Sequence, residues 1–255
     1  MFKVIKYVIV DILRNRFIFA YTAFLLVISL SVFNLESSPS KGLLSMLNII
    51  LIIVPLVSLM FSIIYMYNSV KFIELLLSQP IKRGQLLLSL YTGVCASLLI
   101  AFFIGVCIPV MLLEGSETAY AMMVAGLILT AIFVSLSVLG SVLTRDKAKG
   151  IGIGILIWLY FTLIYDGLLL LAMFQFSDYP IETPLIFLTS LNPVDLARIL
   201  ILLKMDISAL MSFTGAIFDR FFGTAFGFAY SFAIMLLWLL IPMLIAMRRF
   251  KRMDL

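Results

Sequence analysis

The sequence has no histidine among its 255 residues and only two cysteines, Cys95 and Cys107. Both cysteines lie in one apolar segment, so a disulfide scaffold and a histidine-containing metal site are excluded. Without histidine there is no H-E-x-x-H zinc motif and no histidine base for an intramembrane protease. The phosphate-binding motif G-x-x-x-x-G-K-[ST] is also absent. We therefore expect no enzyme, no resident cofactor and no nucleic-acid partner.

Charge is scarce as well: 12% of residues are charged, 64% are hydrophobic, and the mean hydropathy is +1.22. No ordinary soluble core can hide so much apolar sequence. Six apolar segments reach at least 17 residues. Each can cross a hydrocarbon core of ~30 Å at ~1.5 Å per residue, the first only with local thinning of the bilayer or snorkelling of its flanking residues. We predict an all-α polytopic membrane protein with one transmembrane domain, residues 1–255, and spans at 17–33, 43–67, 86–113, 119–143, 151–174 and 224–247.

The basic residues predict the orientation of these spans. Of the 18 cations, fourteen fall in alternating segments: Lys3, Lys6, Arg14 and Arg16; Lys71, Lys82 and Arg83; Arg145, Lys147 and Lys149; and Arg248, Arg249, Lys251 and Arg252. Lys and Arg are concentrated in cytoplasmic loops. The chain is therefore expected in the inner (plasma) membrane as a multi-pass protein with both termini in the cytoplasm.

The first 16 residues predict an amphipathic helix on the inner membrane surface, because charges recur at helical spacing among Val and Ile. A signal peptide is the alternative interpretation. Residues 34–38 offer no A-x-A-like cleavage site, which favours retention of the segment.

One long segment, residues 175–223, separates the last two predicted spans and is expected outside the cell. Asn192 supplies a helix N-cap, Pro193 suits the first helical position, and Asp195 lies in the first turn. We therefore predict a helix from Pro193 towards Lys204.

A second helix in this segment can begin at the capping residue Asp206 and run through Ile217. Both helices are short and rich in Leu and Ile, which is typical of interfacial or re-entrant helices. Counting them as a seventh span would place Arg198 and Lys204 in hydrocarbon and move the basic carboxyl end outside, so we reject it.

The loop at residues 68–85 predicts a short amphipathic helix that ends before Pro80. Glu74 precedes the leucines at 75–77, and the segment ends in Ser78-Gln79-Pro80-Ile81-Lys82-Arg83. This pattern closely resembles the coupling helix of ABC-2 type permeases, which have a type V exporter-like fold. The resemblance implies a permease dimer with two copies of a separate ABC ATPase, and it assigns ATPase coupling to Glu74, Leu75, Leu76, Pro80, Arg83, Arg145 and Lys147.

Within this family the chain is most similar to the membrane subunits that mature the copper site of nitrous oxide reductase. The similarity is carried by Asp166 in Tyr165-Asp166-Gly167 and by the run 191–198, which contains the outer helix motif Asn192, Pro193, Asp195 and Arg198. Residues 70–73 and 90–91 depart from the pattern. The resemblance implies export of a solute or motion relayed to an extracytoplasmic partner, with a periplasmic repeat protein and a copper chaperone as candidate partners.

Asp166 is the one ionisable acid or base in a predicted span. Trp158 and Thr162 precede it by eight and four residues, so the three should share a helix face and line an intramembrane cavity. A lone carboxylate in hydrocarbon costs at least ~2.5 to 3.5 kcal/mol. We expect the carboxyl to be protonated, to face a hydrated cavity, or to pair with Arg198 or Arg220. A structural hydrogen bond from a neutral carboxyl is the alternative.

Weaker patterns concern soft metal ligands and helix packing. Cys107 and Met111, with Met122 and Met123 nearby, could bind Cu(I), although Met is also a common core filler. Two G-x-x-x-G motifs, at 150–154 and 223–227, permit close helix contacts within one subunit or between two. Prolines in three spans predict kinks: Pro55, Pro109 and Pro242.

Two other functions remain open on the sequence. Within the same family, the chain could export a lipid, a glycan or a drug. Outside it, the chain could be an ATP-independent carrier or channel, or an assembly anchor in the lipid membrane. Secondary carriers often show inverted repeats and paired intramembrane charges, and the sequence shows neither.

Overall fold

The computed structural model describes residues 2–36, 38–78, 82–144, 146–176, 182–204, 221–222 and 224–252. Every element in these ranges is helical. The elements are α1 (Phe2–Leu13), α2 (Arg16–Leu35), α3 (Pro39–Asn68), α4 (Val70–Leu77), α5 (Arg83–Phe102), η1 (Phe103–Cys107), α6 (Ile108–Leu113), α7 (Glu117–Leu143), α8 (Lys147–Leu159), η2 (Tyr160–Ile164), α9 (Tyr165–Gln175), α10 (Glu182–Ser190), α11 (Pro193–Lys204) and α13 (Ala225–Lys251).

Six helical segments in the described part of the chain are long and apolar enough to cross a membrane. They are α2, α3, the continuous α5–η1–α6, α7, the continuous α8–η2–α9, and α13. Each predicted span coincides with one of them to within a few residues at either end. The prediction of an all-α polytopic membrane protein is therefore confirmed.

Helix α7 forms the centre of the bundle, packed against α3, α5, α11 and α13. In its most apolar window 78% of the residues are buried, compared with 22% for α2 and α13 and 17% for α8–η2–α9. The peripheral helices therefore turn wide apolar faces away from the chain. Such faces suit lipid hydrocarbon, because an all-round apolar helix must be covered on every side.

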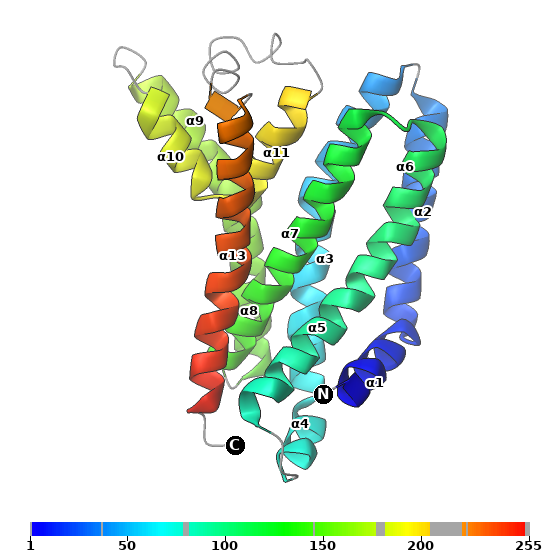
Figure 1. Ribbon diagram of the computed structural model, residues 1–255, viewed down its shortest axis with the longest axis vertical. Helices are drawn as coiled ribbons and strands as arrows, with labels where there is room; N and C mark the ends of the chain where they lie inside the picture. Colours follow the sequence, from blue (N-terminus) through cyan, green and yellow to red (C-terminus); the bar gives the residue numbers. More distant parts are fainter. Residues whose placement is uncertain are drawn as a thin grey trace.

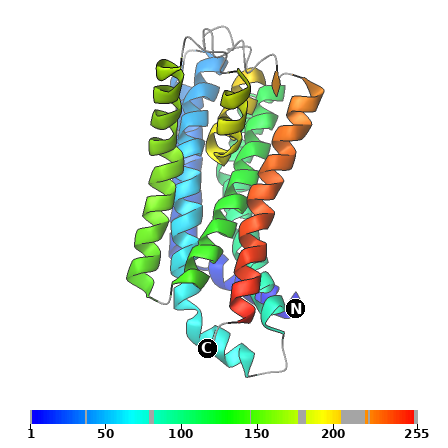
Figure 2. The same cartoon turned by 90° about the vertical axis from the view of Figure 1, so that its left-hand side faces the viewer.

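The bundle has two chemically different ends (Figure 1). One end carries α4, the start of α1 and the close of α13, and we call it the α4 end. The opposite end carries α10 and α11, which we call the hairpin (Figure 2). Because the predicted basic segments all lie next to elements of the α4 end, cations gather there.

The amino-terminal helix is a packed part of the bundle. Val8 and Ile12 are buried against α5. A Cβ at Gly93 of α5 would overlap Val8, so glycine is required for this close approach. On another side of α1, the ring of Tyr7 stacks on Phe72 of α4 with centroids 5.2 Å apart. The predicted helix is present and packs against α5 and α4; its position on the membrane surface stays a prediction.

Each proline within a span leaves the backbone carbonyl four residues before it without its usual N–H donor, since proline has none. Near all three prolines a side chain from another helix donates to a backbone carbonyl, as is common in membrane helices. At Pro109 this is the carbonyl that lost its donor, and at Pro55 and Pro242 it is the next carbonyl along the helix. The bonds run from Ser29 Oγ to Gly105 O (2.9 Å, before Pro109), from Trp158 Nε1 to Ile52 O (3.0 Å, before Pro55) and from Ser135 Oγ to Leu239 O (2.7 Å, before Pro242).

The first G-x-x-x-G motif is explained by contacts within one chain. Gly150 lies against the ring of Tyr67, and a Cβ at Gly154 would lie 2.6 Å from Cδ1 of Ile63. Both contacts are with α3, so these glycines let α8 and α3 approach closely. Gly223 of the second motif lies outside the described residues.

Candidate functional site

The hairpin is re-entrant in shape. Its two helices, compared over Pro184–Ser190 and Pro193–Lys204, are bent by 113°, and they occupy only the upper part of the bundle in Figure 2. The predicted start of α11 is confirmed, because Asn192 Oδ1 accepts a hydrogen bond from the N–H of Val194 at 3.0 Å. The second predicted outer helix, 206–217, falls outside the described residues.

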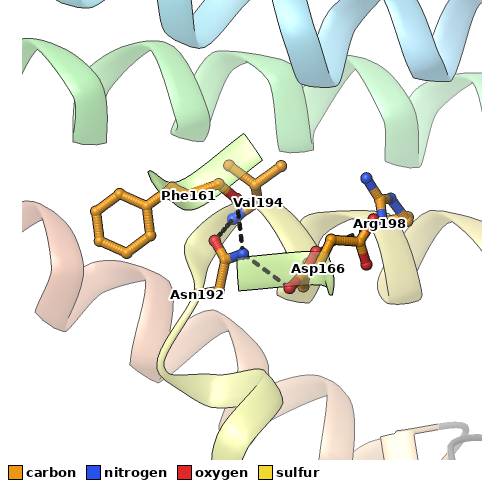
Figure 3. A network of polar contacts seen from close by, with 6 residues as sticks. Phe161, Asp166, Asn192, Val194 and Arg198 are labelled. Carbon is orange, nitrogen blue, oxygen red and sulfur yellow. Dashed lines mark hydrogen bonds and ion pairs between the residues drawn. The ribbon is translucent and has the colours of Figure 1, made fainter. Parts of the chain in front are cut away.

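A charge network joins the hairpin to the fifth span (Figure 3). Arg198 Nη1 lies 2.6 Å from Asp166 Oδ2 and 3.5 Å from Asp195 Oδ1. Of the three states expected for Asp166, the structure shows the pairing with Arg198. The pair is partly covered, with side chains 38% exposed for Asp166 and 24% for Arg198, while Asp195 is buried. One guanidinium thus serves two carboxylates on two elements.

Asn192 lies at the corner between α10 and α11 and connects the hairpin to the backbone of the fifth span. Its buried side-chain amide donates to the carbonyl of Phe161 at 2.8 Å and to Asp195 Oδ2 at 2.7 Å. Phe161 lies in the π turn η2, a type of widened turn that frequently marks functional sites. Together with its N-cap bond, Asn192 uses both its donor and its acceptor (Figure 3). This residue therefore does more than cap α11.

Three aromatic side chains also hold the hairpin, and the sequence analysis missed them. The hydroxyl of Tyr165 donates to the carbonyl of Leu188 at 2.5 Å. Tyr230 and Trp238 of α13 donate to the side chain and carbonyl of Ser190 at 3.1 and 3.3 Å. Aromatic residues with a polar tip inside a span were the available signal, since a buried Tyr or Trp usually has a hydrogen-bond partner.

Trp158, Thr162 and Asp166 have separate neighbours. Trp158 donates to Ile52 of α3, Thr162 donates to the carbonyl of Trp158 in its own helix at 2.7 Å, and Asp166 meets Arg198 of α11. The π turn between the first and the third adds a residue to the turn and so changes the register predicted from a regular helix. The shared-cavity role of these residues stays a prediction.

The short amphipathic helix predicted at residues 68–85 is present as α4. Glu74 and Leu75 point outward, and Leu75 is 61% exposed. Leu76 is buried with Ile73, so it anchors α4 to the bundle instead of facing a partner. Pro80 lies outside the described residues. Of the leucine run, Leu75 is therefore the side chain most available for direct contact.

The second basic loop is attached to the base of α4. Lys147 Nζ donates to Asn68 Oδ1 at 2.9 Å, and the hydroxyl of Tyr67 donates to the carbonyl of Thr144 at 2.9 Å. Arg83 lies in the first turn of α5, where its side chain is half-buried. Arg145, the other predicted coupling residue, lies outside the described residues.

Cys107 and Met111, two of the predicted soft ligands, do not share one environment. Cys107 is 1% exposed whereas Met111 is 43% exposed, so the two predicted neighbours face different surroundings. In the described part of the chain no group of three or more Cys, Asp and Glu side chains is arranged to hold a metal ion. The described residues therefore give no support to a site shared by Cys107 and Met111.

Comparison with known proteins gives a consistent result. A family model described as ABC-2 family transporter protein matches residues 9–255. A probable ABC transporter permease protein NosY from Stutzerimonas stutzeri is 26% identical over 212 residues, which cover 74% of this chain and 76% of that protein. A protein of the same description from Pseudomonas aeruginosa is 31% identical over 146 residues, or 53% of each chain.

Proposed function

The chain belongs to the ABC-2 transporter family as the permease subunit of an ABC transporter, and we propose that it couples ATP hydrolysis on a separate subunit to movement of the hairpin. The family implies an ABC ATPase partner. We place that partner on the outward face of α4, formed by Lys71, Glu74, Leu75 and Ser78, which are all exposed. A charged pair around one large apolar side chain suits a docking surface, because charges set orientation while the apolar contact adds affinity.

The observation that carries this proposal is the position of two unlike structures at opposite ends of one bundle. The α4 end offers an exposed amphipathic helix, and the hairpin end offers a short helix pair held by hydrogen bonds and ion pairs. The hairpin's link to the fifth span through Asp166 and Arg198 provides a route for motion between the ends. In this proposal the α4 end faces the cytoplasm, in agreement with its basic residues.

We further propose that the complex contains two permease copies and two ATPases, and that its output is motion relayed to an extracytoplasmic partner during maturation of nitrous oxide reductase. The NosY relatives support this output, as does the resemblance of the runs around Asp166 and Asn192. An exporter of lipid, glycan or drug is the competing output. It predicts transport of such a solute by the purified complex, whereas the relay predicts loss of reductase copper sites when the chain is deleted.

The test reverses the charge on the docking face. Glu74→Lys should weaken binding of the ABC ATPase and lower its permease-stimulated ATP turnover. The change replaces the pair of opposite charges on the docking face with two like charges, which opposes the proposed orientation of the partner. Copurification and turnover are measured for the complex in lipid nanodiscs. Glu117→Lys is the matched control, since Glu117 is also exposed but begins α7 at the hairpin end. Wild-type binding and turnover in Glu74→Lys would remove α4 from the mechanism.

A further inference from the structure

Two neighbouring helices are irregular at the same depth of the bundle. α3 contains Pro55, and the span beside it passes from α8 into the π turn η2. The two helices run antiparallel: Gly150 lies against Tyr67 near the α4 end, and Trp158 donates to the carbonyl of Ile52 further along. η2 begins directly after α8, so both irregularities fall on adjacent turns of facing helices.

On the α4 side of these irregularities the two helices are firmly joined. Gly154 brings α8 within contact of Ile63, and Lys147 bonds to Asn68 at the base of α4. The helices have no such glycine-mediated contact beyond the irregularities in the described residues. We call the joined part the α4 unit, which comprises residues 56–77 and 146–159.

We propose, on the premise that an ATPase docks on α4, that the α4 unit moves as one body about a hinge formed by Pro55 and η2, and that Trp158 is the positioning residue of this hinge. Proline removes one backbone hydrogen bond from α3. A π turn replaces the regular helical bonds with wider ones that join residues five apart, and such turns are frequently found at functional sites. In α3 the carbonyl that lost its donor is that of Leu51. Next to it Trp158 joins the two helices, because its indole N–H bonds to Ile52 O at 3.0 Å.

The surroundings of the hinge allow such movement. One turn beyond Pro55, the buried hydroxyl of Ser58 has no hydrogen-bond partner among the described residues. Full hydrogen bonding would oppose any change at this turn, and the unsatisfied hydroxyl removes part of that opposition.

The hinge also reaches the hairpin. Phe161, in η2, accepts the hydrogen bond from Asn192 at the corner between α10 and α11. Rotation at η2 therefore displaces the atom to which the corner is bonded. The hinge therefore transmits movement of a partner on α4 to the hairpin.

Distances between spin labels test the rigid unit in the complex with the ABC ATPase. Cys95 and Cys107 are first replaced by alanine. One labelled pair, Val70→Cys with Ile155→Cys, lies within the α4 unit, and a second, Val70→Cys with Tyr120→Cys, spans the hinge; all three sites are exposed. A non-hydrolysable ATP analogue should shift the second distance and leave the first unchanged. Equal shifts in both distances would contradict the proposal.

Pro55→Ala tests the hinge itself, because it restores a backbone N–H to α3 and should abolish the shift across the hinge while ATPase binding is kept. Pro242→Ala is the matched control. Pro242 also lies in a span and also has a carbonyl satisfied from another helix, by Ser135, but it is outside the α4 unit. This control should keep the wild-type shift. A normal shift in Pro55→Ala would overturn the hinge.

Hydrogen exchange of the permease alone tests the role of Trp158 without any ATPase. Trp158→Phe should accelerate exchange at residues 52–56 and 156–166 together, since it removes the bond that joins them. The control Trp238→Phe removes a different indole bond, to Ser190, and should leave these segments unchanged. Unchanged exchange in Trp158→Phe contradicts the positioning role. A wild-type chain that binds no ATPase contradicts the proposed function instead.

Discussion

Asp166 is an acidic side chain in a membrane-spanning segment, and its partner comes from a different element. Arg198 of α11 lies 2.6 Å from it and also approaches Asp195 at 3.5 Å. Because charges in hydrocarbon are stable only when paired or hydrated, these residues depend on one another. Removing the one cation should harm the protein more than removing either acid.

A double-mutant cycle with Asp166→Asn and Arg198→Gln measures this dependence. Arg198→Gln should be the more destabilising single change, because it leaves two carboxylates without their cation. The double variant should be more stable than the sum of the single effects predicts, by roughly 0.5 to 3 kcal/mol. Thermal unfolding in detergent gives the comparison. Additive effects would contradict the network, and Arg249→Gln combined with Asp166→Asn serves as the additive control.

Asn192 shows how one residue can serve two elements. As an N-cap alone it would be replaceable by Asp, because Asn and Asp cap helices about equally well. Its side-chain N–H groups, however, donate to Phe161 and Asp195. An aspartate would lose both donors and place a carboxylate beside Asp195.

We therefore expect Asn192→Asp to destabilise the protein more than Asn192→Ala, by about 1 kcal/mol or more. The midpoint of thermal unfolding and the yield of folded protein measure the effect. Ser116→Asp is the control, because Ser116 caps α7 through a bond from Ala119 and, within the described residues, donates no hydrogen bond to an acid. If Asn192→Asp behaves like wild type, the residue acts only as a cap.

At the scale of helices, Pro109 is tolerated because a neighbouring helix supplies a donor to the carbonyl that the proline leaves without one. The hydroxyl of Ser29 in α2 lies 2.8 Å from Leu25 O in its own helix and 2.9 Å from Gly105 O before Pro109, and its one hydrogen is shared between these two acceptors. Gly105 lets α2 come close, since a Cβ there would lie 2.6 Å from Cβ of Leu25. The effect of a proline in a span thus depends on the neighbouring helix as well as on its own.

Ser29→Ala should destabilise the protein by roughly 1 to 3 kcal/mol, the cost of an unsatisfied buried polar group. Ser97 gives a matched control, because it is equally buried but bonds only to Gly93 O in its own helix. Ser97→Ala should therefore have little effect. Denaturation of both variants in the same detergent decides the matter, and equal effects would show that the bond across helices adds nothing.

At the scale of the whole molecule, the bundle separates a basic end from the hairpin end. Lys147 and Lys149 begin α8, and Arg248, Arg249 and Lys251 close α13 at the same end as α4. Because cytoplasmic loops are rich in Lys and Arg, this arrangement predicts one orientation for the entire chain.

Cysteine labelling in intact cells measures this orientation. In a background without Cys95 and Cys107, an impermeant maleimide should label Glu117→Cys at the hairpin end and should not label Arg252→Cys at the α4 end. Both positions are exposed, so access is limited by the membrane and not by packing. Permeabilised cells provide the control for reactivity. Labelling of Arg252→Cys in intact cells would reverse the predicted orientation.

Much of the fold and the start of the hairpin could be predicted because the determining interactions are local. Apolar length determines the spans, and Asn192, Pro193 and Asp195 together determine where α11 begins, since a cap and the first turn involve only residues adjacent in the chain. The short amphipathic helix at α4 could be predicted for the same reason, although its outward side could not: Leu76 is buried and Leu75 exposed only because of what lies beside the helix.

The tertiary structure decided which helices are neighbours, and with that the partners of the polar groups. Arg198 and Arg220 were equal candidates for Asp166 until the hairpin placed Arg198 beside it. The bond from Trp158 to Ile52 spans 106 positions of sequence, and no local pattern encodes it. The physical reason is that a buried polar group needs a hydrogen-bond partner, and the sequence reveals this need. Which residue becomes the partner depends on how the helices pack, and the apolar surfaces that drive packing are compatible with more than one arrangement.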